Sequence, residues 1–217
     1  VVIWLVVLII FLGNLKPIDC SEIPACSCNG VYRIYPGFFT EGFDVYCEDG
    51  WTVFQKRFDG KTSFFRNWAD YKYGFGNVSG EHWLGNDKLF TLTSNKNYSV
   101  RFDITDINDE RAFATYSTFR VGDESLKYKM TVGVYNGTAG DSFWTHSGNM
   151  FSTTDNDNDM WLGGNCVTQR EGGYWYNSCG WTNLNGKYTL GQSGWNLMIW
   201  EGFRMYDSLK SCVMKLK

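Results

Sequence analysis

The sequence predicts an α+β domain built from short strands and short helices. Three observations support this class: brief runs in which apolar and polar residues alternate, two helix-like segments that stop near glycine, and seven cysteines. Alternation with a period of two is typical of half-buried strands. Turn-forming residues flank these runs, so we expect strands at residues 31–35, 44–47, 51–57, 98–104 and 127–132.

Two short helices are expected at residues 67–74 and 81–89, because both segments stop near a glycine. From residue 138 to residue 194 the chain consists almost entirely of turn formers and aromatic residues. A long irregular region inside a compact domain is usually functional and needs stabilisation from outside its own backbone. The sequence therefore predicts a site built from loops at one end of the domain.

Residues 1–12 form an unbroken apolar run. A membrane span needs about 20 residues, whereas this run has the length of the hydrophobic region of a secretory signal peptide. We assign residues 1–18 to a signal peptide that is incomplete at its start, since no basic residue and no initiator Met precede the run, and residues 19–217 to one folded domain. A buried N-terminal strand is the alternative. No second apolar run occurs that could anchor the mature protein, so a secreted, extracellular protein is expected.

The seven cysteines are expected to form disulfides, because a secreted chain folds in an oxidising compartment. A zinc site at Cys26 and Cys28 is the competing interpretation. However, the chain has only two histidines and no second close pair of cysteines. Because the chain is expected to be secreted, the three sequons at Asn77, Asn97 and Asn136 are candidate glycosylation sites.

The charge pattern and the absence of motifs argue against two classes of function. The net charge is −3 and no basic stripe is present, so nucleic acid is not expected as a partner. The common catalytic motifs do not occur, and neither His82 nor His146 lies in a recognisable constellation. The chain is therefore not expected to be an enzyme, and both histidines are expected to be surface or packing residues.

The most distinctive chemical feature is an acidic tract in which Asp155, Asp157 and Asp159 alternate with asparagine. No Lys, Arg or His lies between residues 150 and 165 to neutralise these carboxylates. Closely spaced oxygen donors suit a calcium ion. The tract is not an EF-hand, because its sixth position is Met160 rather than glycine and its twelfth is not glutamate. A solvated acidic turn is the alternative to a calcium site.

Several motifs occur together in the order found in a known family. They are Gly50-Trp-Thr-Val-Phe-Gln-Lys-Arg-Phe-Asp-Gly60, Glu81-His-Trp-Leu-Gly-Asn86, Phe151-Ser-Thr-Thr-Asp-Asn-Asp-Asn-Asp159, Tyr174-Trp-Tyr-Asn-Ser-Cys179 and Asn183-Leu-Asn-Gly-Lys-Tyr188. From about Asp19 to Lys217 the chain resembles the fibrinogen C-terminal (fibrinogen-related) domain, and its short form is similar to tachylectin-like and ficolin-like invertebrate lectins. The resemblance implies a globular domain with a central antiparallel sheet, short helices and a loop-built subdomain for calcium and ligand.

The resemblance also implies how calcium is held. It assigns carboxylate ligands to Asp157 and Asp159 and backbone carbonyl ligands to Trp161 and Gly163. It further implies a cis peptide bond close to this loop.

Part of the disulfide pairing follows from the same resemblance, which implies a bond between Cys166 and Cys179. Cys47 is expected to pair with Cys20 or Cys28, and Cys212 to tie down another N-terminal cysteine. Because seven is an odd number, one thiol is left free or links a second chain. The second case would give a disulfide-linked homo-oligomer, which would raise avidity for a weakly bound ligand.

In the lectin members of the family, a pocket beside the calcium loop captures the acetyl groups of N-acetylated sugars. The ligand-binding positions that this implies here are Asn165, Cys179, Gly180, Trp181 and Phe203. The sequence departs from the lectin pattern, because Gly180 stands where the lectins have His, Phe203 stands where they have Tyr, and no aromatic-Ala pair occurs at residues 191–194. Trp181 and Trp195 are additional aromatic residues that either rebuild a binding surface or belong to the core.

Two functions are expected on these grounds. The first is a secreted, calcium-dependent, lectin-like protein of innate immunity that binds glycans or glycoproteins on microbial surfaces. The alternative is a protein-binding module of the same fold, such as a haemostasis-modulating, venom or salivary factor. The departures in the acetyl pocket favour this alternative.

Overall fold

The computed structural model describes residues 16–24, 27–37 and 39–217. The expected signal peptide therefore lies almost wholly outside the described residues. Among the helices that are described, we find none that combines the length and the apolar character needed to cross a membrane.

One antiparallel sheet of ten strands organises the described part of the chain. Its main path runs β1-β2-β3-β12-β6-β7-β8, which are Gly30–Ile34, Phe43–Glu48, Trp51–Arg57, Ser211–Leu216, Tyr98–Thr105, Arg111–Val121 and Met130–Val132. Three short strands pair beside this path: β4 (Phe75–Gly76), β5 (His82–Trp83) and β9 (Tyr135–Gly137). A separate small sheet consists of β10 (Thr182–Asn183) and β11 (Ile199–Trp200).

The helices are short and connect these strands. In chain order they are η1 (Cys20–Glu22), α2 (Trp68–Tyr73), α3 (Asn86–Asn95), η2 (Glu124–Leu126), η3 (Phe143–His146), α4 (Cys166–Arg170) and α5 (Glu201–Arg204), where η marks a 3₁₀ turn. Asparagine side chains begin two of them, because Asn67 accepts an amide hydrogen bond at the start of α2 and Asn165 does so at the start of α4.

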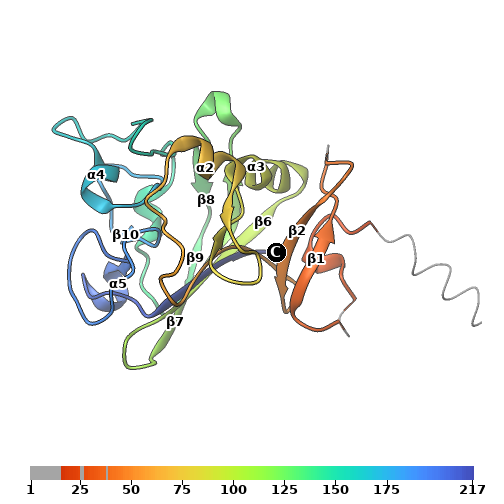
Figure 1. Cartoon of the computed structure of the whole chain (residues 1–217), viewed down its shortest axis with the longest axis horizontal. Coiled ribbons are helices and arrows are strands. Elements are labelled where there is room, and N and C mark those ends of the chain that lie inside the picture. Colours follow the sequence, from red (N-terminus) through yellow and green to blue (C-terminus); the bar gives the residue numbers. More distant parts are fainter. Residues whose placement is uncertain (1–15, 25–26, 38) are drawn as a thin grey trace, which may run out of the picture.

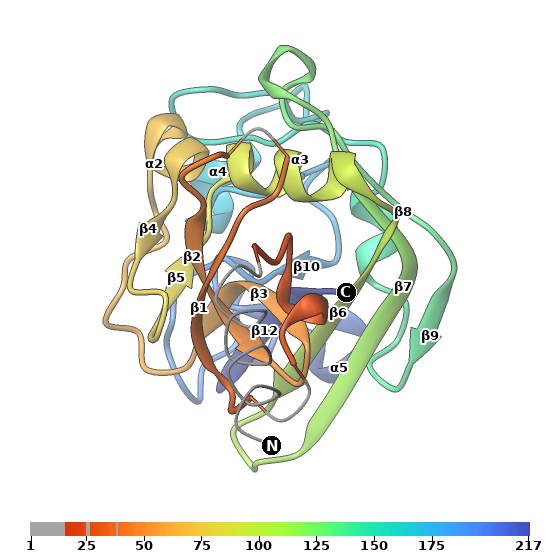
Figure 2. The same cartoon turned by 90° about the vertical axis from the view of Figure 1, so that its right-hand side faces the viewer.

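The last strand of the chain, β12, lies in the middle of the sheet between β3 and β6 (Figure 2). This position buries Cys212, Met214 and Leu216. At one end of the molecule lie β1 and β2, and at the other lie α4, β10 and α5 (Figure 1). The second end carries the long irregular region that the sequence predicts.

A cluster of aromatic side chains fastens the irregular region to the sheet. Trp175 is fully buried, and its ring lies 5.1 Å from that of Phe151 and 5.9 Å from that of Trp83. Its indole N–H donates to the carbonyl of Tyr128 at 2.8 Å. Aromatic packing with a satisfied polar atom gives the loops a rigid base without regular secondary structure.

Most of the predicted strands are confirmed, since β1, β2, β3 and β6 lie within a residue or two of the expected ranges. The run at residues 127–132 forms a strand only from Met130. Lys127 and Tyr128 have φ angles of 52° and 51°, so the backbone turns there instead of extending. The sequence pattern does not predict β7, although it is the longest of the described strands.

The helix predicted at residues 81–89 is wrong over its first half. This segment starts with β5, and α3 begins only after Gly85, whose φ is 117°. The buried carboxylate of Glu81 explains the extended chain, because it lies 3.8 Å from Arg57 and accepts hydrogen bonds from four backbone amides. These amides belong to the turn after β3: Phe58, Asp59, Gly60 and Thr62.

Two disulfides are present among the described residues, Cys20–Cys47 and Cys166–Cys179. Both pairings agree with the sequence prediction. The first joins η1 to β2, and the second joins the start of α4 to a loop 13 residues further on. A link that closes a loop of this size stabilises the fold by about 3 kcal/mol in the chain-entropy picture.

The disulfide expected for Cys212 is wrong. The alternation of β12 directs this side chain into the core, where its thiol lies 3.2 Å from the side-chain oxygen of Gln55. Burial raises the pKa of the Cys212 thiol to about 12. Cys28 is exposed and has no disulfide partner among the described residues, and Cys26 lies outside them. A disulfide-linked homo-oligomer therefore stays a prediction.

The side chains of the three sequon asparagines are exposed: Asn77, Asn97 and Asn136. Exposure is what attachment of a glycan requires. Their modification stays a prediction.

Candidate functional site

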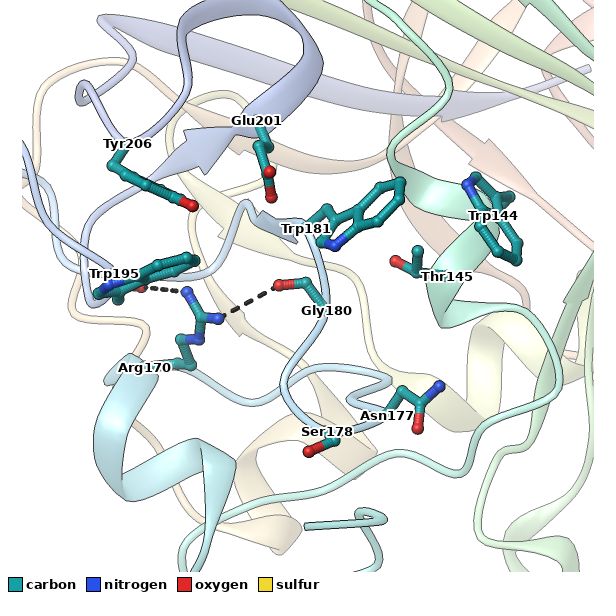
Figure 3. Close-up of a pocket in the computed structure, with 10 residues that line it drawn as sticks. All are labelled: Trp144, Thr145, Arg170, Asn177, Ser178, Gly180, Trp181, Trp195, Glu201 and Tyr206. Atoms are coloured by element: carbon teal, nitrogen blue, oxygen red, sulfur yellow. Dashed lines mark hydrogen bonds between the residues drawn. The ribbon is translucent and has the colours of Figure 1, made fainter.

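The candidate site is a cavity of about 350 Å³ at the end of the molecule that carries α4, β10 and α5 (Figure 3). Segments far apart in the sequence form its walls. The lining residues are Trp144, Thr145, Arg170, Asn177, Ser178, Gly180, Trp181, Trp195, Glu201 and Tyr206.

Two pairs of aromatic side chains stand around the cavity. Trp144 and Trp181 pack edge to face, with ring centroids 5.8 Å apart, and Trp195 packs on Tyr206 at 3.7 Å. Trp144, Trp181 and Trp195 remain 53%, 44% and 43% exposed. Trp181 and Trp195 therefore belong to a surface and not to the core. Partly exposed aromatic faces around a cavity are a common feature of binding sites.

Arg170 connects two of the loops that line the cavity. Its guanidinium donates to the carbonyl of Trp195 at 3.0 Å and to the carbonyl of Gly180 at 3.2 Å, and it lies 4.6 Å from the Trp195 ring. The side chain is only 4% exposed, and burial lowers the pKa of Arg170. Because its partners are carbonyls and an aromatic face, Arg170 holds the shape of the cavity from one wall.

Asn183 secures the same loops from beneath the cavity. Its side-chain amide donates to the carbonyls of Arg170, Trp195 and Leu197 at 2.8, 3.2 and 3.1 Å. Its oxygen accepts from the Tyr176 hydroxyl at 2.7 Å. A buried amide that satisfies several chain segments fixes their relative positions, because each bond would be costly to lose in the interior.

His146 is fully buried behind Gly180. Its Nδ1–H donates to the carbonyl of Trp175 at 2.9 Å, and its Nε2 accepts from the amide of Thr182 at 3.2 Å. A Cβ atom on Gly180 would lie only 2.4 Å from the imidazole Cε1. The absence of a side chain at Gly180, whose φ is 87°, therefore makes room for the histidine ring.

Burial lowers the pKa of His146 to about 4. The positive charge of Arg170 acts in the same direction, and the hydrogen bond to Trp175 opposes it. The imidazole is therefore neutral at physiological pH and serves as a packing residue, as the sequence predicts for it.

Strained backbone gathers next to the cavity. Glu171, Cys179 and Met205 have positive φ angles of 56°, 44° and 50°. Each is the direct neighbour of a lining residue, and Met205 combines its φ with a ψ of −114°, a region that disfavours side chains. Strain of this kind costs about 1–3 kcal/mol per residue and concentrates at functional sites.

The acidic tract lies beside α4, and its carboxylates have different partners. Asp159 accepts from the amide of Trp161 at 2.8 Å and from the amide of Cys166 at 2.7 Å. Burial raises the pKa of Asp159, and so does the charge of Asp157. Asp155 instead accepts from the amide of Trp68 at 2.9 Å, which places it at the start of α2.

The donor set around Asp159 fits calcium. Carboxylates of Asp157 and Asp159 lie close enough to interact, and among the described residues no base forms an ion pair with either. The Trp161 carbonyl accepts only a long bond from Gly164, at 3.3 Å, and no backbone amide in the described ranges bonds the Gly163 carbonyl. Calcium prefers such oxygen donors, completed by water. No group of three or more His, Cys, Asp and Glu side chains converges within the described chain, so carbonyls would have to complete the set.

The cis peptide bond that the resemblance implies near this loop is absent: none occurs within residues 16–24, 27–37 and 39–217. Instead, the chain turns at Cys179 and Gly180 through two successive residues with positive φ. This turn aims the Gly180 carbonyl at Arg170.

The structure brings together only some of the residues that the resemblance implies for ligand binding. Gly180 and Trp181 line the cavity, and Cys179 lies directly beside it. Asn165 caps α4 instead, and the Phe203 ring packs under the guanidinium of Arg204 at 4.1 Å.

The sequence reasoning missed much of the lining. Tyr206 lines the cavity, although no motif in the sequence pointed to it. Trp144, Arg170 and Glu201 were also missed. The density of tryptophan in the irregular region was the one available signal, but it did not indicate which rings face outward.

The sequence and the fold match known proteins over nearly the whole chain. Residues 17–217 match the family described as "Fibrinogen beta and gamma chains, C-terminal globular domain". Fibrinogen C domain-containing protein 1-B of Xenopus laevis is 41% identical over 219 residues, which cover 93% of this chain and 47% of that protein. The chain thus spans about half the length of this curated relative.

Solved structures share the fold as well. The fibrinogen-like globe domain of human ANGPTL2 matches with a TM-score of 0.89 and 38% identity, and the match covers 93% of this chain and 98% of that one. Lamprey fibrin D-dimer, complexed with the peptide ligand Gly-His-Arg-Pro-amide, matches with a TM-score of 0.88 and 33% identity over 94% of this chain and 74% of that one.

None of these three proteins is a tachylectin or a ficolin, so the narrower resemblance to those lectins stays a prediction. The match of residues 17–217 covers the sheet, both disulfides and every residue that lines the cavity. The chain belongs to the family of fibrinogen C-terminal globular domains.

Proposed function

We propose that this chain is an extracellular recognition module that binds a short segment of a protein partner in the tryptophan-lined cavity. The observation that carries the proposal is the exposure of Trp144, Trp181 and Trp195 around one cavity with strained walls. Buried or stacked aromatic anchors supply a large share of binding energy in protein interfaces. The peptide bound to lamprey fibrin supports a peptide ligand for this fold. The module binds and does not catalyse.

Replacing Trp181 with alanine should weaken binding of a cavity ligand by about 2 kcal/mol, because an exposed aromatic wall is lost. Isothermal titration with Gly-His-Arg-Pro-amide supplies the peptide probe. Tyr73→Ala is the matched control, since Tyr73 is 64% exposed and does not line the cavity. Equal affinity in wild type and Trp181→Ala would contradict the assignment of the site, and binding to neither protein would argue against a peptide ligand of this kind.

A glycan is the second candidate ligand, because partly exposed tryptophan faces also stack on sugar rings. Titration of the same proteins with N-acetylglucosamine distinguishes a glycan ligand from a peptide ligand. The acetyl pocket of the lectin members would need a histidine at Gly180, and His146 occupies the adjacent space. This packing favours the peptide over the acetylated sugar.

We further propose that Asp157 and Asp159, with the carbonyls of Trp161 and Gly163, hold calcium. A bound calcium ion would neutralise the two carboxylates and supply positive charge at this loop. The chain's own contribution is to orient Asp159 through the amides of Trp161 and Cys166. Since Cys166 begins α4 and α4 ends at Arg170, an ordered acidic loop would also steady one wall of the cavity.

Calcium should raise the stability of the wild-type protein and leave Asp159→Asn unaffected. At a free calcium concentration one hundred times the dissociation constant, the free energy of unfolding should rise by about 2.7 kcal/mol. Thermal unfolding with and without chelator, together with calorimetric titration of calcium, measures it. Asp155→Asn is the control, because asparagine can also cap α2 and Asp155 is bound to Trp68. Undetectable calcium uptake by the wild type, or equal uptake by Asp159→Asn, would contradict this site.

A further inference from the structure

Glu201 contributes the one carboxylate to the lining of the cavity. The residue is half-buried at the start of α5. Its backbone amide donates to the carbonyl of Trp181 at 3.0 Å, which fixes its position. No donor in the described part of the chain forms a hydrogen bond or an ion pair with its carboxylate. A carboxylate that has no partner in the protein is free to pair with a positively charged group of a ligand.

Aromatic side chains flank this carboxylate on both sides. Figure 3 shows Glu201 between Tyr206 and Trp181, and Trp195 stacks on Tyr206 at 3.7 Å. The faces of aromatic rings carry negative charge density and attract cations. Carboxylate and rings therefore favour the same kind of ligand group at this end of the cavity.

Arg170 does not fill that role. Its guanidinium is engaged with the carbonyls of Gly180 and Trp195, and with the Trp195 ring. No ion pair joins it to Glu201 in the described chain, although the two charges are near enough for Glu201 to raise the pKa of Arg170 slightly against the effect of burial. A ligand cation would accordingly lie at the Glu201 end, away from the arginine.

The surroundings distinguish between kinds of cation. A primary ammonium has three N–H donors that need acceptors. In Figure 3, the Tyr206 hydroxyl lies on the Glu201 side, whereas the polar side chains of Asn177, Ser178 and Thr145 lie away from Glu201, so a primary ammonium would find few side-chain acceptors there. A quaternary ammonium has no donors, is weakly hydrated, and is recognised by aromatic faces together with a negative charge.

We propose that the Glu201 end of the cavity is a subsite for a quaternary ammonium group, of the kind that choline carries. Trp181 and Tyr206 supply the aromatic walls, Trp195 supports Tyr206 from behind, and Glu201 supplies the charge. The proposal rests on the proposed use of this cavity for ligand binding and adds a chemical class to it.

The test uses choline chloride and its neutral isostere 3,3-dimethyl-1-butanol, titrated into the full-length protein while tryptophan fluorescence is recorded. Choline should bind about tenfold more tightly than the isostere, and Glu201→Gln should remove this difference. Nα-acetyl-lysine methylamide, which carries a primary ammonium as a protein partner would, should bind more weakly than choline.

Glu41→Gln is the matched control, because Glu41 is exposed and does not line the cavity. Thermal unfolding of both variants separates loss of binding from loss of fold. The subsite is overturned if choline and its isostere bind alike, if Glu201→Gln leaves choline binding unchanged, or if the lysine probe binds more tightly than choline. If one of these results is found but Trp181→Ala still loses peptide binding, the cavity remains the binding site. Only the quaternary ammonium subsite is then wrong.

Discussion

Replacing Gly180 with alanine should lower the free energy of unfolding by about 3 kcal/mol, which is more than an ordinary glycine-to-alanine change in a turn. Two causes add together. The φ of 87° disfavours any side chain, and the new Cβ would lie 2.4 Å from Cε1 and 2.8 Å from Nε2 of His146. The imidazole cannot retreat easily, because it is bonded to both Trp175 and Thr182. Urea unfolding of the two proteins measures the difference.

Gly148 provides a matched control for the destabilisation that comes from the positive φ alone. Its φ is 85°, nearly that of Gly180, but a Cβ at Gly148 would meet nothing within 4 Å. Gly148→Ala should therefore cost only about 1 kcal/mol. If the two substitutions lower the free energy of unfolding equally, His146 does not pack against Gly180 as described.

A double-mutant cycle sharpens this test. His146→Ala removes the ring that the new Cβ would meet, so Gly180→Ala should cost less in that background than in the wild type. Gly180→His, which restores the residue of the lectin members, should destabilise the wild-type protein as Gly180→Ala does. It should not create binding of N-acetylglucosamine.

The second large effect is a loss of stability in mild acid. His146 is neutral in the folded protein, with a pKa lowered from 6.5 to about 4 by burial, whereas in the unfolded chain it titrates near its ordinary value. The unfolded state therefore binds more protons between these two pH values, so stability falls as the pH is lowered from about 6.5 to about 4. The full difference is about 3 kcal/mol. Protonation of Nε2 would also convert it from an acceptor into a donor, which would then face the Thr182 amide, itself a donor.

Urea unfolding at a series of pH values between 4 and 7 tests this dependence. His146→Gln should reduce the change of the free energy of unfolding with pH, whatever effect the substitution has on stability at pH 7. His82→Gln is the companion variant, because burial also lowers the pKa of His82. This variant should keep most of the pH dependence of the free energy of unfolding. An unchanged slope in His146→Gln would mean that the ring is accessible to protons in the folded state.

The sequence by itself determined the local features of this protein. Alternation specified β1, β2, β3 and β6, because side chains that face one layer of core need a period of two. Asn67 specified the start of α2 through a cap that reaches only three residues along the chain. The family motifs indicated the fold as a whole and the Cys166–Cys179 bond.

Only the tertiary structure decided which residues share the site. Trp144, Arg170, Trp195 and Glu201 are separated by up to 57 positions, and they meet because η3, α4, α5 and the loop that carries Trp195 come together only in the folded chain. Elements of four or five residues are too short to show a period, so no sequence pattern distinguished the outward-facing rings from the core.

The same limit applies to the interpretation of single residues. Asp155 belongs to the acidic tract by sequence, but it caps α2 across 87 positions. Cys212 belongs to the set of cysteines by composition, but its place on a central strand buries it with no disulfide partner among the described residues. In each case, the role of the residue depends on a partner from a distant part of the chain, and contacts of that kind exist only once the chain has folded.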